Sequence, residues 1–439
     1  MEHILTKTSS PLIVELDGGV VASSLDWESA LRFVAEQPSA ALKLPFWALR
    51  GRSFVRRRLA GRVTLDPSAL PYREDVVGAL REQRRRGRRI VLRADDEAFA
   101  ELVAGHLGLN GEAEEETAGG EGLGRGPLSD GRRYRIDPPE TPWAKPRARM
   151  SARDLVRALR PHQWVKNLLL IVPLILSQRP AGAADFARVA AAFLAFSLAA
   201  SFVYVTNDLL DLPSDRKHPT KRHRPFASGR APIVHGLVLA LGLIVPAVLL
   251  AAILSPLFLG LLLLYTATCL VYSLHIKKLE ILDVLCLSGL YTLRLFAGGV
   301  VTGVALSAWL LAFSMFLFLS LAFAKRYVEL DGASHGGTLL GRGYGASDLH
   351  MVRILGPLSG YLSVLVICLY VQDHAATTLY RHPGLLWCLC PILLYWVTRL
   401  WFFAQRGELD SDPVLFALRD RTSLVCGLGS LVLFLAARL

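Results

Sequence analysis

The sequence predicts an all-α polytopic membrane protein of about nine transmembrane helices, preceded by a small α/β N-terminal domain. The prediction depends on where the apolar residues lie. Hydrophobic residues make up 52% of the 439 residues, and the long apolar runs all follow residue 150. The earlier part carries nearly balanced charge and no run that could cross a bilayer. We therefore expect a domain at 1–109, a disordered linker at 110–150 and a transmembrane domain at 151–439.

The N-terminal region predicts a strand and turn at 13–20, a second strand at 88–93 and a helix at 96–107. With Glu15 and Asp17 in the first strand and turn, it resembles the haloacid-dehalogenase-like phosphatase family. The resemblance implies a degenerate, non-catalytic cytoplasmic domain, because Glu15 stands where that family has its nucleophilic aspartate. Only Asp17 fits its family position. The glycine- and glutamate-rich stretch that follows is typical of a linker.

The apolar stretches of the second part predict nine membrane spans. A helix needs about 20 residues to cross a bilayer, so the first stretch is short. The six cysteines lie in these stretches without metal-site spacing, and we expect them to be reduced. The stretches run roughly over 164–178, 186–206, 232–254, 255–273, 281–301, 305–324, 354–372, 384–402 and 421–438.

Basic residues in the loops predict the orientation. Most lysines and arginines fall in the loops on the side of residues 207–231, whereas the opposite loops carry only Arg179 and Arg381. Loops rich in lysine and arginine stay in the cytoplasm. We therefore expect the 207–231 loop and the N-terminal domain on the cytoplasmic face of the inner membrane.

A cluster of oxygen donors follows the second stretch: Asn207, Asp208, Asp211 and Asp215. If the helix continued, the four would fall within an arc of about 100°. Such a cluster is costly at a bilayer edge unless it has a function, and oxygen donors of this kind bind Mg²⁺. We predict a magnesium site here. Pro213 disfavours a continuous helix, which puts the role of Asp215 in doubt.

Further polar residues predict a pyrophosphate site. A pyrophosphate leaving group gains negative charge as its bond breaks, and Mg²⁺ with lysine and arginine stabilises that charge. We expect Asp208, Asp211 and Lys217 to be catalytic. Candidate substrate-binding residues lie near the same membrane face or within its spans: Lys166, Asn167, Lys221, Arg222, Arg224, Tyr272, Lys277, Asp283, Arg294, Lys325, Arg326 and Tyr344.

Some of these residues could have a structural role instead of binding a ligand. Lys166 could snorkel to the membrane surface. Tyr272 alone would be an interface aromatic, although Lys277 and Asp283 nearby favour a site. An arginine as deep as Arg294 needs a partner or an aqueous cavity, and we expect a cavity.

The pattern Asn-Asp-x-x-Asp-x-x-x-Asp at 207–215 resembles the signature of the UbiA prenyltransferase superfamily, and the spans of 151–439 are similar to that fold. The stretches 160–167, 215–229 and 291–299 resemble its decaprenyl-phosphate phosphoribosyltransferase branch. The resemblance implies an Mg²⁺-dependent enzyme of cell-envelope biosynthesis. It would move 5-phosphoribose from phosphoribosyl pyrophosphate to a polyprenyl phosphate and release pyrophosphate.

Two alternatives stay open. Other enzymes of this superfamily transfer the prenyl chain of a prenyl diphosphate to an aromatic or other acceptor, and the metal motif does not separate the two reactions. A lipid-binding or transport protein without catalysis is the other alternative, and the intact acidic and basic residues argue against it. We expect a lipid and phosphoribosyl pyrophosphate as partners, no nucleic acid, and leave a homo-oligomer open.

Overall fold

The computed structural model describes residues 12–59, 62–94, 96–109, 150–177, 179–334, 343–374, 379–409 and 412–438. Within these ranges the chain forms two compact units. The first contains residues up to 158 together with 208–238, and the second contains 159–207 and 239–439. The linker expected at 110–150 lies outside the described residues except for Met150.

The N-terminal part of the first unit is a small α/β structure. Strand β1 (Leu12–Glu15) pairs in parallel with β2 (Ile90–Arg93), so both expected strands are confirmed. The expected helix at 96–107 is also confirmed. It is α6 (Glu97–His106), where the Asp96 carboxylate accepts a hydrogen bond from the Phe99 N–H at 3.2 Å and caps the helix. The haloacid-dehalogenase-like ancestry of this part stays a prediction.

Short helices make up most of the rest of the first unit, and two of them, α5 and α6, form its core with the strands. Leu16, Val77 and Val103 are buried between the two strands and helices α5 and α6. The helices are α1 (Leu25–Glu36), α2 (Pro38–Ala41), α3 (Leu44–Ala48), α4 (Arg52–Leu59), the 3₁₀ turn η1 (Pro67–Ala69), α5 (Glu74–Arg85) and α7 (Ala152–Leu159).

The rest of the described chain is helical. Its long helices are α9 (Ala183–Leu210), α11 (Ile233–Leu254), α12 (Pro256–Leu274), α13 (Leu282–Thr302), α14 (Ala308–Ser334), α15 (Leu349–Gln372), α17 (Leu389–Gln405) and α19 (Arg421–Arg438). Shorter elements lie between them: η2 (Pro161–Ile171), α8 (Val172–Leu176), η4 (Ile276–Lys278), η5 (Ala346–Asp348), η6 (Pro383–Cys388) and α18 (Pro413–Arg419).

Eight helices of the described chain are long and apolar enough to cross a membrane, and they coincide with eight of the expected spans. The protein is therefore a multi-pass membrane protein. The first expected span, at 164–178, differs, because it forms η2 followed by the short helix α8. Proline explains part of this difference: Pro173 has no N–H to donate to a preceding carbonyl, so a regular α-helix is interrupted there.

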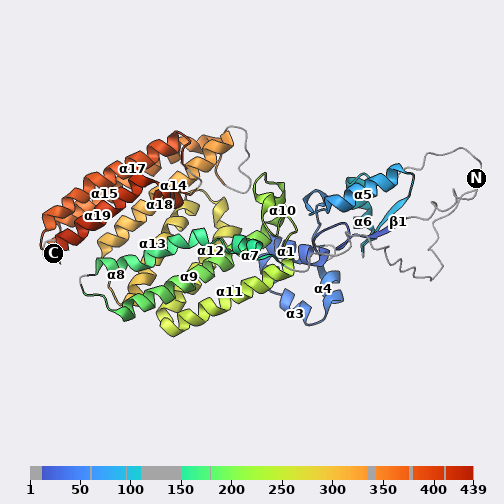
Figure 1. Ribbon diagram of the computed structural model, residues 1–439, viewed down its shortest axis with the longest axis horizontal. Coiled ribbons are helices and arrows are strands. Elements are labelled where there is room, and N and C mark those ends of the chain that lie inside the picture. Colours follow the sequence, from blue (N-terminus) through green and yellow to red (C-terminus); the bar gives the residue numbers. More distant parts are fainter. Residues whose placement is uncertain are drawn as a thin grey trace, which may run out of the picture. The chain divides into compact units, whose positions relative to one another are not determined.

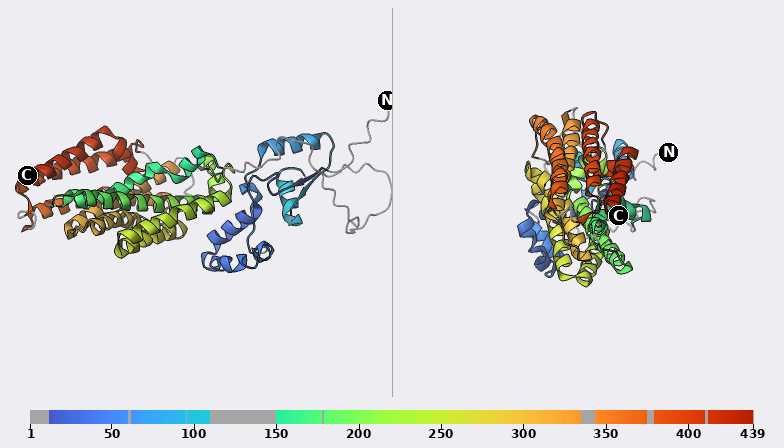
Figure 2. Two further views of the ribbon diagram at one scale, coloured as in Figure 1. Left: turned by 60° about the horizontal axis from the view of Figure 1, so that its bottom comes forward. Right: turned by 90° about the vertical axis from the view of Figure 1, so that its left-hand side faces the viewer.

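The long helices of the second unit pack side by side. Figure 1 shows α14, α15, α17 and α19 running alongside one another, and Figure 2 shows the same arrangement from two further directions. One buried cluster joins α13, α14, α15 and α17 through residues such as Phe318 and Trp401. A second joins α9, α11, α12 and α13, where Ala195 and Ala251 allow a close approach around Phe258.

Close approach also fixes η2 against α13. A Cβ atom added at Gly298 would lie 2.2 Å from the carbonyl oxygen of Leu170 in η2. No side chain fits in that space. Gly298 therefore allows η2, which carries Lys166 and Asn167, to lie directly on α13, which carries Arg294.

Candidate functional site

The acidic motif lies where α9 ends. The helix stops at Leu210, and Asp211 precedes a new short helix, α10 (Leu212–Lys217). Pro213 occupies the first turn of α10, where its missing N–H costs nothing. The continuous helix on which the predicted arc depended is therefore absent, because the chain bends at Asp211. Asp208 and Asp215 lie on different helices, yet both are buried.

Arg224 joins these two buried carboxylates. Its Nη1 donates to Asp208 Oδ1 at 3.0 Å and to Asp215 Oδ2 at 2.6 Å. Asp215 is thus brought to Asp208 despite Pro213, through a shared guanidinium group. Burial raises the pKa of Asp215, and Arg224 opposes that rise. The carboxylates of Asp208 and Asp215 therefore share one cation, the guanidinium group of Arg224.

The donors fit Mg²⁺ in their chemistry. The side-chain oxygen of Asn207 is buried and has no hydrogen-bond partner among the residues that the structure describes, so it can still serve as a ligand. No three acidic, histidine or cysteine side chains of the described residues lie close enough to hold a metal ion by themselves. Mg²⁺ commonly takes one or two protein carboxylates and completes its shell with water and phosphate oxygens. The residues therefore fit a site that a substrate completes.

The basic residues after the motif separate into two groups. Lys221 and Arg222 lie on the 3₁₀ turn η3 (Lys221–His223), are exposed, and form no ion pair with any residue in the described ranges. Arg216 and Lys217 instead face the N-terminal domain. Lys217, which we expected to be catalytic, donates from Nζ to Asp66 at 2.8 Å. The structure brings it to that carboxylate, and its catalytic role stays a prediction.

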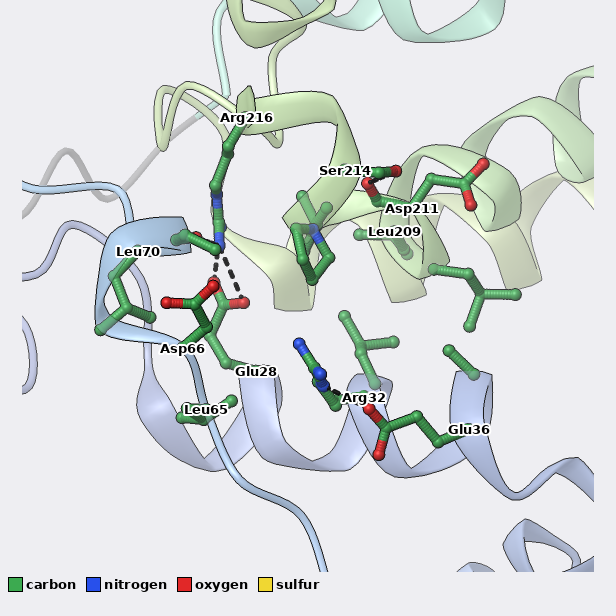
Figure 3. Close-up of a pocket in the computed structure, with 16 residues that line it drawn as sticks. Glu28, Arg32, Glu36, Leu65, Asp66, Leu70, Leu209, Asp211, Ser214 and Arg216 are labelled. Atoms are coloured by element: carbon green, nitrogen blue, oxygen red, sulfur yellow. Dashed lines mark hydrogen bonds and ion pairs between the residues drawn. The ribbon is translucent and has the colours of Figure 1, made fainter. Parts of the chain in front are cut away.

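Arg216 is held by hydrogen bonds to Glu28, Ala69 and Ala227. Its Nη2 donates to Glu28 Oε1 at 2.6 Å, and its Nη1 donates to Glu28 Oε2 at 3.1 Å and to the carbonyl of Ala69 at 2.8 Å. Figure 3 shows this pair beside Asp211 and Ser214. These residues line a pocket of about 210 Å³ between α1 and residues 209–216.

In the second unit, η2 presents Lys166 to Asp412. The two atoms Lys166 Nζ and Asp412 Oδ2 are 2.5 Å apart, and the lysine lies over the ring of Tyr291. Lys166 therefore does not snorkel to the surface, because its charge is neutralised inside the protein. Asp412 also caps α18 by accepting hydrogen bonds from the Val414 and Leu415 N–H groups.

The prediction of a cavity around Arg294 is wrong, because protein groups accept the hydrogen bonds of its guanidinium group. Its Nε donates to the side-chain oxygen of Asn167 at 2.9 Å, and its other nitrogens donate to the Tyr265 hydroxyl and the Leu290 carbonyl. Asn167 in turn donates to Ser197 at 3.1 Å. A buried charge is stable where several oxygens accept its hydrogen bonds. Arg294 and Asn167, which we expected to bind substrate, are therefore hydrogen-bonded to each other.

A third cluster joins the start of α13 to the later part of α14. Asp283 and Arg326 are fully buried and form an ion pair with Nη2 and Oδ2 2.5 Å apart. The hydroxyl of Tyr344 donates to Asp283 at 2.8 Å, and Glu329 pairs with the other side of Arg326. These predicted binding residues are brought together in the protein interior. Three other candidates are half-buried: Tyr272, Lys277 and Lys325.

Several residues of these clusters, among them Asp412, Tyr265 and Glu28, were not among the sequence candidates. Asp412 could have been found, because aspartate followed by proline is typical of a helix start. Tyr265 lies seven residues before Tyr272, and this spacing places both on one helix face. Glu28 has no such signal, because its partner Arg216 is far away in the chain.

The chain matches a known family over its membrane part. The model of the UbiA prenyltransferase family matches residues 168–424, more than half of the chain. Among solved structures, a UbiA homolog from Archaeoglobus fulgidus bound to GPP and Mg²⁺ superimposes with a TM-score of 0.50 at 14% identity. The match covers 65% of this chain and 99% of that one, which supports the same fold.

Several curated proteins are similar in sequence. The uncharacterized protein y4nM of Sinorhizobium fredii is 32% identical over 95% of this chain and 89% of its own length. The nodulation protein NoeC of Azorhizobium caulinodans is 35% identical over 65% of this chain and 93% of its own. The decaprenyl-phosphate phosphoribosyltransferase of Mycobacterium tuberculosis is 32% identical over 61% of this chain and 88% of its own length. Together with the fold, these matches show that the chain belongs to the UbiA prenyltransferase family and is a membrane transferase of the UbiA superfamily.

Proposed function

We propose that this transferase moves 5-phosphoribose from phosphoribosyl pyrophosphate to a polyprenyl phosphate. The observation that carries the proposal is the pair Lys221 and Arg222. Both are exposed directly after the acidic motif, and neither is neutralised by a described residue. Exposed cations beside carboxylates are suited to binding an anionic ligand together with a metal ion.

The charge of the donor favours this substrate. A prenyl diphosphate carries one pyrophosphate, whereas phosphoribosyl pyrophosphate carries a pyrophosphate and a separate 5-phosphate. Lys221 and Arg222 provide cationic charge beyond Arg224, which the carboxylates already occupy. The names of similar proteins support the same choice, since decaprenyl-phosphate phosphoribosyltransferases are among them.

The reaction needs few protein groups. A phosphate oxygen of the polyprenyl phosphate attacks the anomeric carbon of the ribose, and the bond from that carbon to pyrophosphate breaks. The attacking oxygen is already ionised at neutral pH, so no general base is required. The lysines and arginines beside the motif hold the phosphates and stabilise the negative charge that develops on the leaving group.

Mg²⁺ is part of the proposal. Asn207, Asp208 and Asp211 would hold the ion, with Asp215 as a further candidate. When bound, the ion neutralises charge on the pyrophosphate oxygens and orients them. We also propose that this end of the protein faces the cytoplasm, because the basic loops lie on its side.

Prenyl transfer from a prenyl diphosphate is the second candidate. The observation that favours it is the common fold with the archaeal UbiA homolog, which binds GPP and Mg²⁺. That reaction needs groups that activate an aromatic or hydroxyl acceptor. In the described second unit, Tyr265, Asn167 and Arg294 are instead joined to one another.

A labelling experiment tests the proposal. Purified protein in lipid is incubated with polyprenyl phosphate, Mg²⁺ and donor that carries radioactive phosphorus in its 5-phosphate. We expect label in the lipid phase, lost on chelation of Mg²⁺ and regained when Mg²⁺ is returned. Label in the pyrophosphate instead should appear in the aqueous phase and serves as the matched control. Absence of lipid label, with prenylation of an aromatic acid from a prenyl diphosphate, would decide for the second candidate.

A further inference from the structure

The acidic motif is attached to the N-terminal domain by a buried ion pair. Arg216 of α10 and Glu28 of α1 are both almost completely buried, and the Glu28 carboxylate accepts a further hydrogen bond from the Ser23 hydroxyl at 2.5 Å. The guanidinium also donates to the Ala227 carbonyl in its own segment. Removing one partner of such a pair leaves the other charge buried alone, which makes the contact costly to break.

Two further contacts join the same surfaces. Lys217 pairs with Asp66, whose other oxygen is held by the backbone and side chain of Ser68. Gly229 has a φ of +70°, and a Cβ atom there would lie 2.8 Å from the Cβ of Ala22. The motif segment and the N-terminal domain therefore meet at several points, one of them too tight for any side chain.

Helix α10 depends on these contacts. It has six residues, far fewer than the roughly 12–15 that an isolated helix needs for marginal stability in water. Its last three residues contact two different parts of the protein. Asp215 pairs with Arg224, which also pairs with Asp208. Arg216 and Lys217 pair with Glu28 and Asp66 of the N-terminal domain. Fixing the last two residues also fixes the carboxylate next to them.

We propose that the N-terminal domain is a positioning domain for the acidic motif, with Glu28 and Asp66 as its positioning residues. By holding Arg216 and Lys217, they keep α10 folded and Asp215 directed towards Arg224 and Asp208. The inference rests on the proposed function in one respect, namely that the motif binds the metal–pyrophosphate group. Outer contacts of this kind commonly change metal affinity or activity by about 10–100-fold when removed.

Hydrogen exchange of the full-length protein without Mg²⁺ or substrate tests the contact itself. We compare Glu28→Gln and Asp66→Asn with Glu82→Gln, a control whose partner Arg86 directly follows α5 and is exposed. Glu28→Gln should speed exchange of the α10 amides by at least about tenfold, which corresponds to ~1.4 kcal/mol. Asp66→Asn should speed it by a smaller factor, about two- to fivefold, because its pair with Lys217 is exposed. The control should leave it unchanged. Protection of the α5 and β2 amides shows whether the N-terminal domain is still folded. If Glu28→Gln unfolds the domain, the exchange of α10 in Asp66→Asn tests the contact instead.

The rate of transfer tests the consequence. In Glu28→Gln the Mg²⁺ concentration for half-maximal rate should rise about 10-fold, while the KM for the lipid stays the same. Glu28→Asp, which keeps the charge, should restore part of the effect. Unchanged exchange in α10, or faster exchange with an unchanged Mg²⁺ requirement, would overturn the inference. If the wild type transfers a prenyl chain instead, the proposed function fails, while the exchange result still decides on the contact.

Discussion

Arg224 holds the buried carboxylates of the acidic motif together. Its guanidinium lies between Asp208 and Asp215 and removes the repulsion that two buried carboxylates would otherwise exert. Asp211 stands at the bend between two helices and lines the pocket shown in Figure 3. The motif therefore presents its three carboxylates in two settings, a buried pair around Arg224 and a single group at the pocket.

Changing Asp211 should affect catalysis more than folding. We expect Asp211→Ala to lower the transfer rate by roughly a hundredfold or more, because metal-assisted charge stabilisation supplies several kcal/mol. The measurement is the initial rate of label transfer at saturating Mg²⁺. Asp75→Ala, at an exposed position of the N-terminal domain, is the control. A near-normal rate in a folded Asp211→Ala protein would remove Asp211 from the site.

Two asparagines should behave differently when replaced. Asn167 holds Arg294 and Ser197, so Asn167→Ala leaves a buried guanidinium N–H without its acceptor. This should cost about 1–3 kcal/mol of stability. The side-chain oxygen of Asn207 has no such partner among the described residues, so Asn207→Ala should lower the rate with a smaller loss of stability. Thermal unfolding in detergent and the transfer rate separate the two; equal stability losses would contradict the assignment.

Among the elements, η2 is shaped by its packing against α13. It occupies the place of the first expected span, and its contact with α13 requires Gly298. This contact brings Asn167 to Arg294, and so determines the geometry of the buried cluster in the second unit.

A matched pair of substitutions in α13 tests the contact. Gly298→Ala should destabilise the protein by about 1–3 kcal/mol, because the new methyl group collides with the Leu170 carbonyl. Gly289 lies in the same helix with open space around it, so Gly289→Ala should be neutral or stabilise by up to about 1 kcal/mol. Unfolding of both variants in lipid or detergent gives the comparison. Equal effects would show that η2 does not depend on this approach.

The whole molecule combines a membrane transferase with a small α/β N-terminal domain. Glu15 ends β1 with its side chain exposed, and its carboxylate is one methylene longer than the aspartate of active phosphatases of the resembling family. We expect the full-length protein to hydrolyse no generic phosphate ester with Mg²⁺. The check is phosphate release by the wild type and by Asp17→Asn. Release that Asp17→Asn abolishes would show that the domain is an active phosphatase.

Much of the architecture follows from the sequence, because membrane spans depend on local composition. A run of about 20 apolar residues must form a helix in a bilayer to satisfy its backbone. The positions of eight spans and the identity of the acidic motif were therefore predictable. The structure of the first expected span was less predictable, because it depends both on Pro173 and on the close approach of Leu170 to Gly298.

The sequence by itself determined which chemical groups are present: carboxylates, amides and cations in a pattern that suits a metal and a pyrophosphate. Only the tertiary structure decided which groups neutralise one another. Arg294 meets Asn167, Lys166 meets Asp412, and Arg216 meets Glu28, although each pair is far apart in the chain. The physical reason is that a buried charge takes whichever partner the packing brings within about 3 Å, and packing is a property of the whole fold.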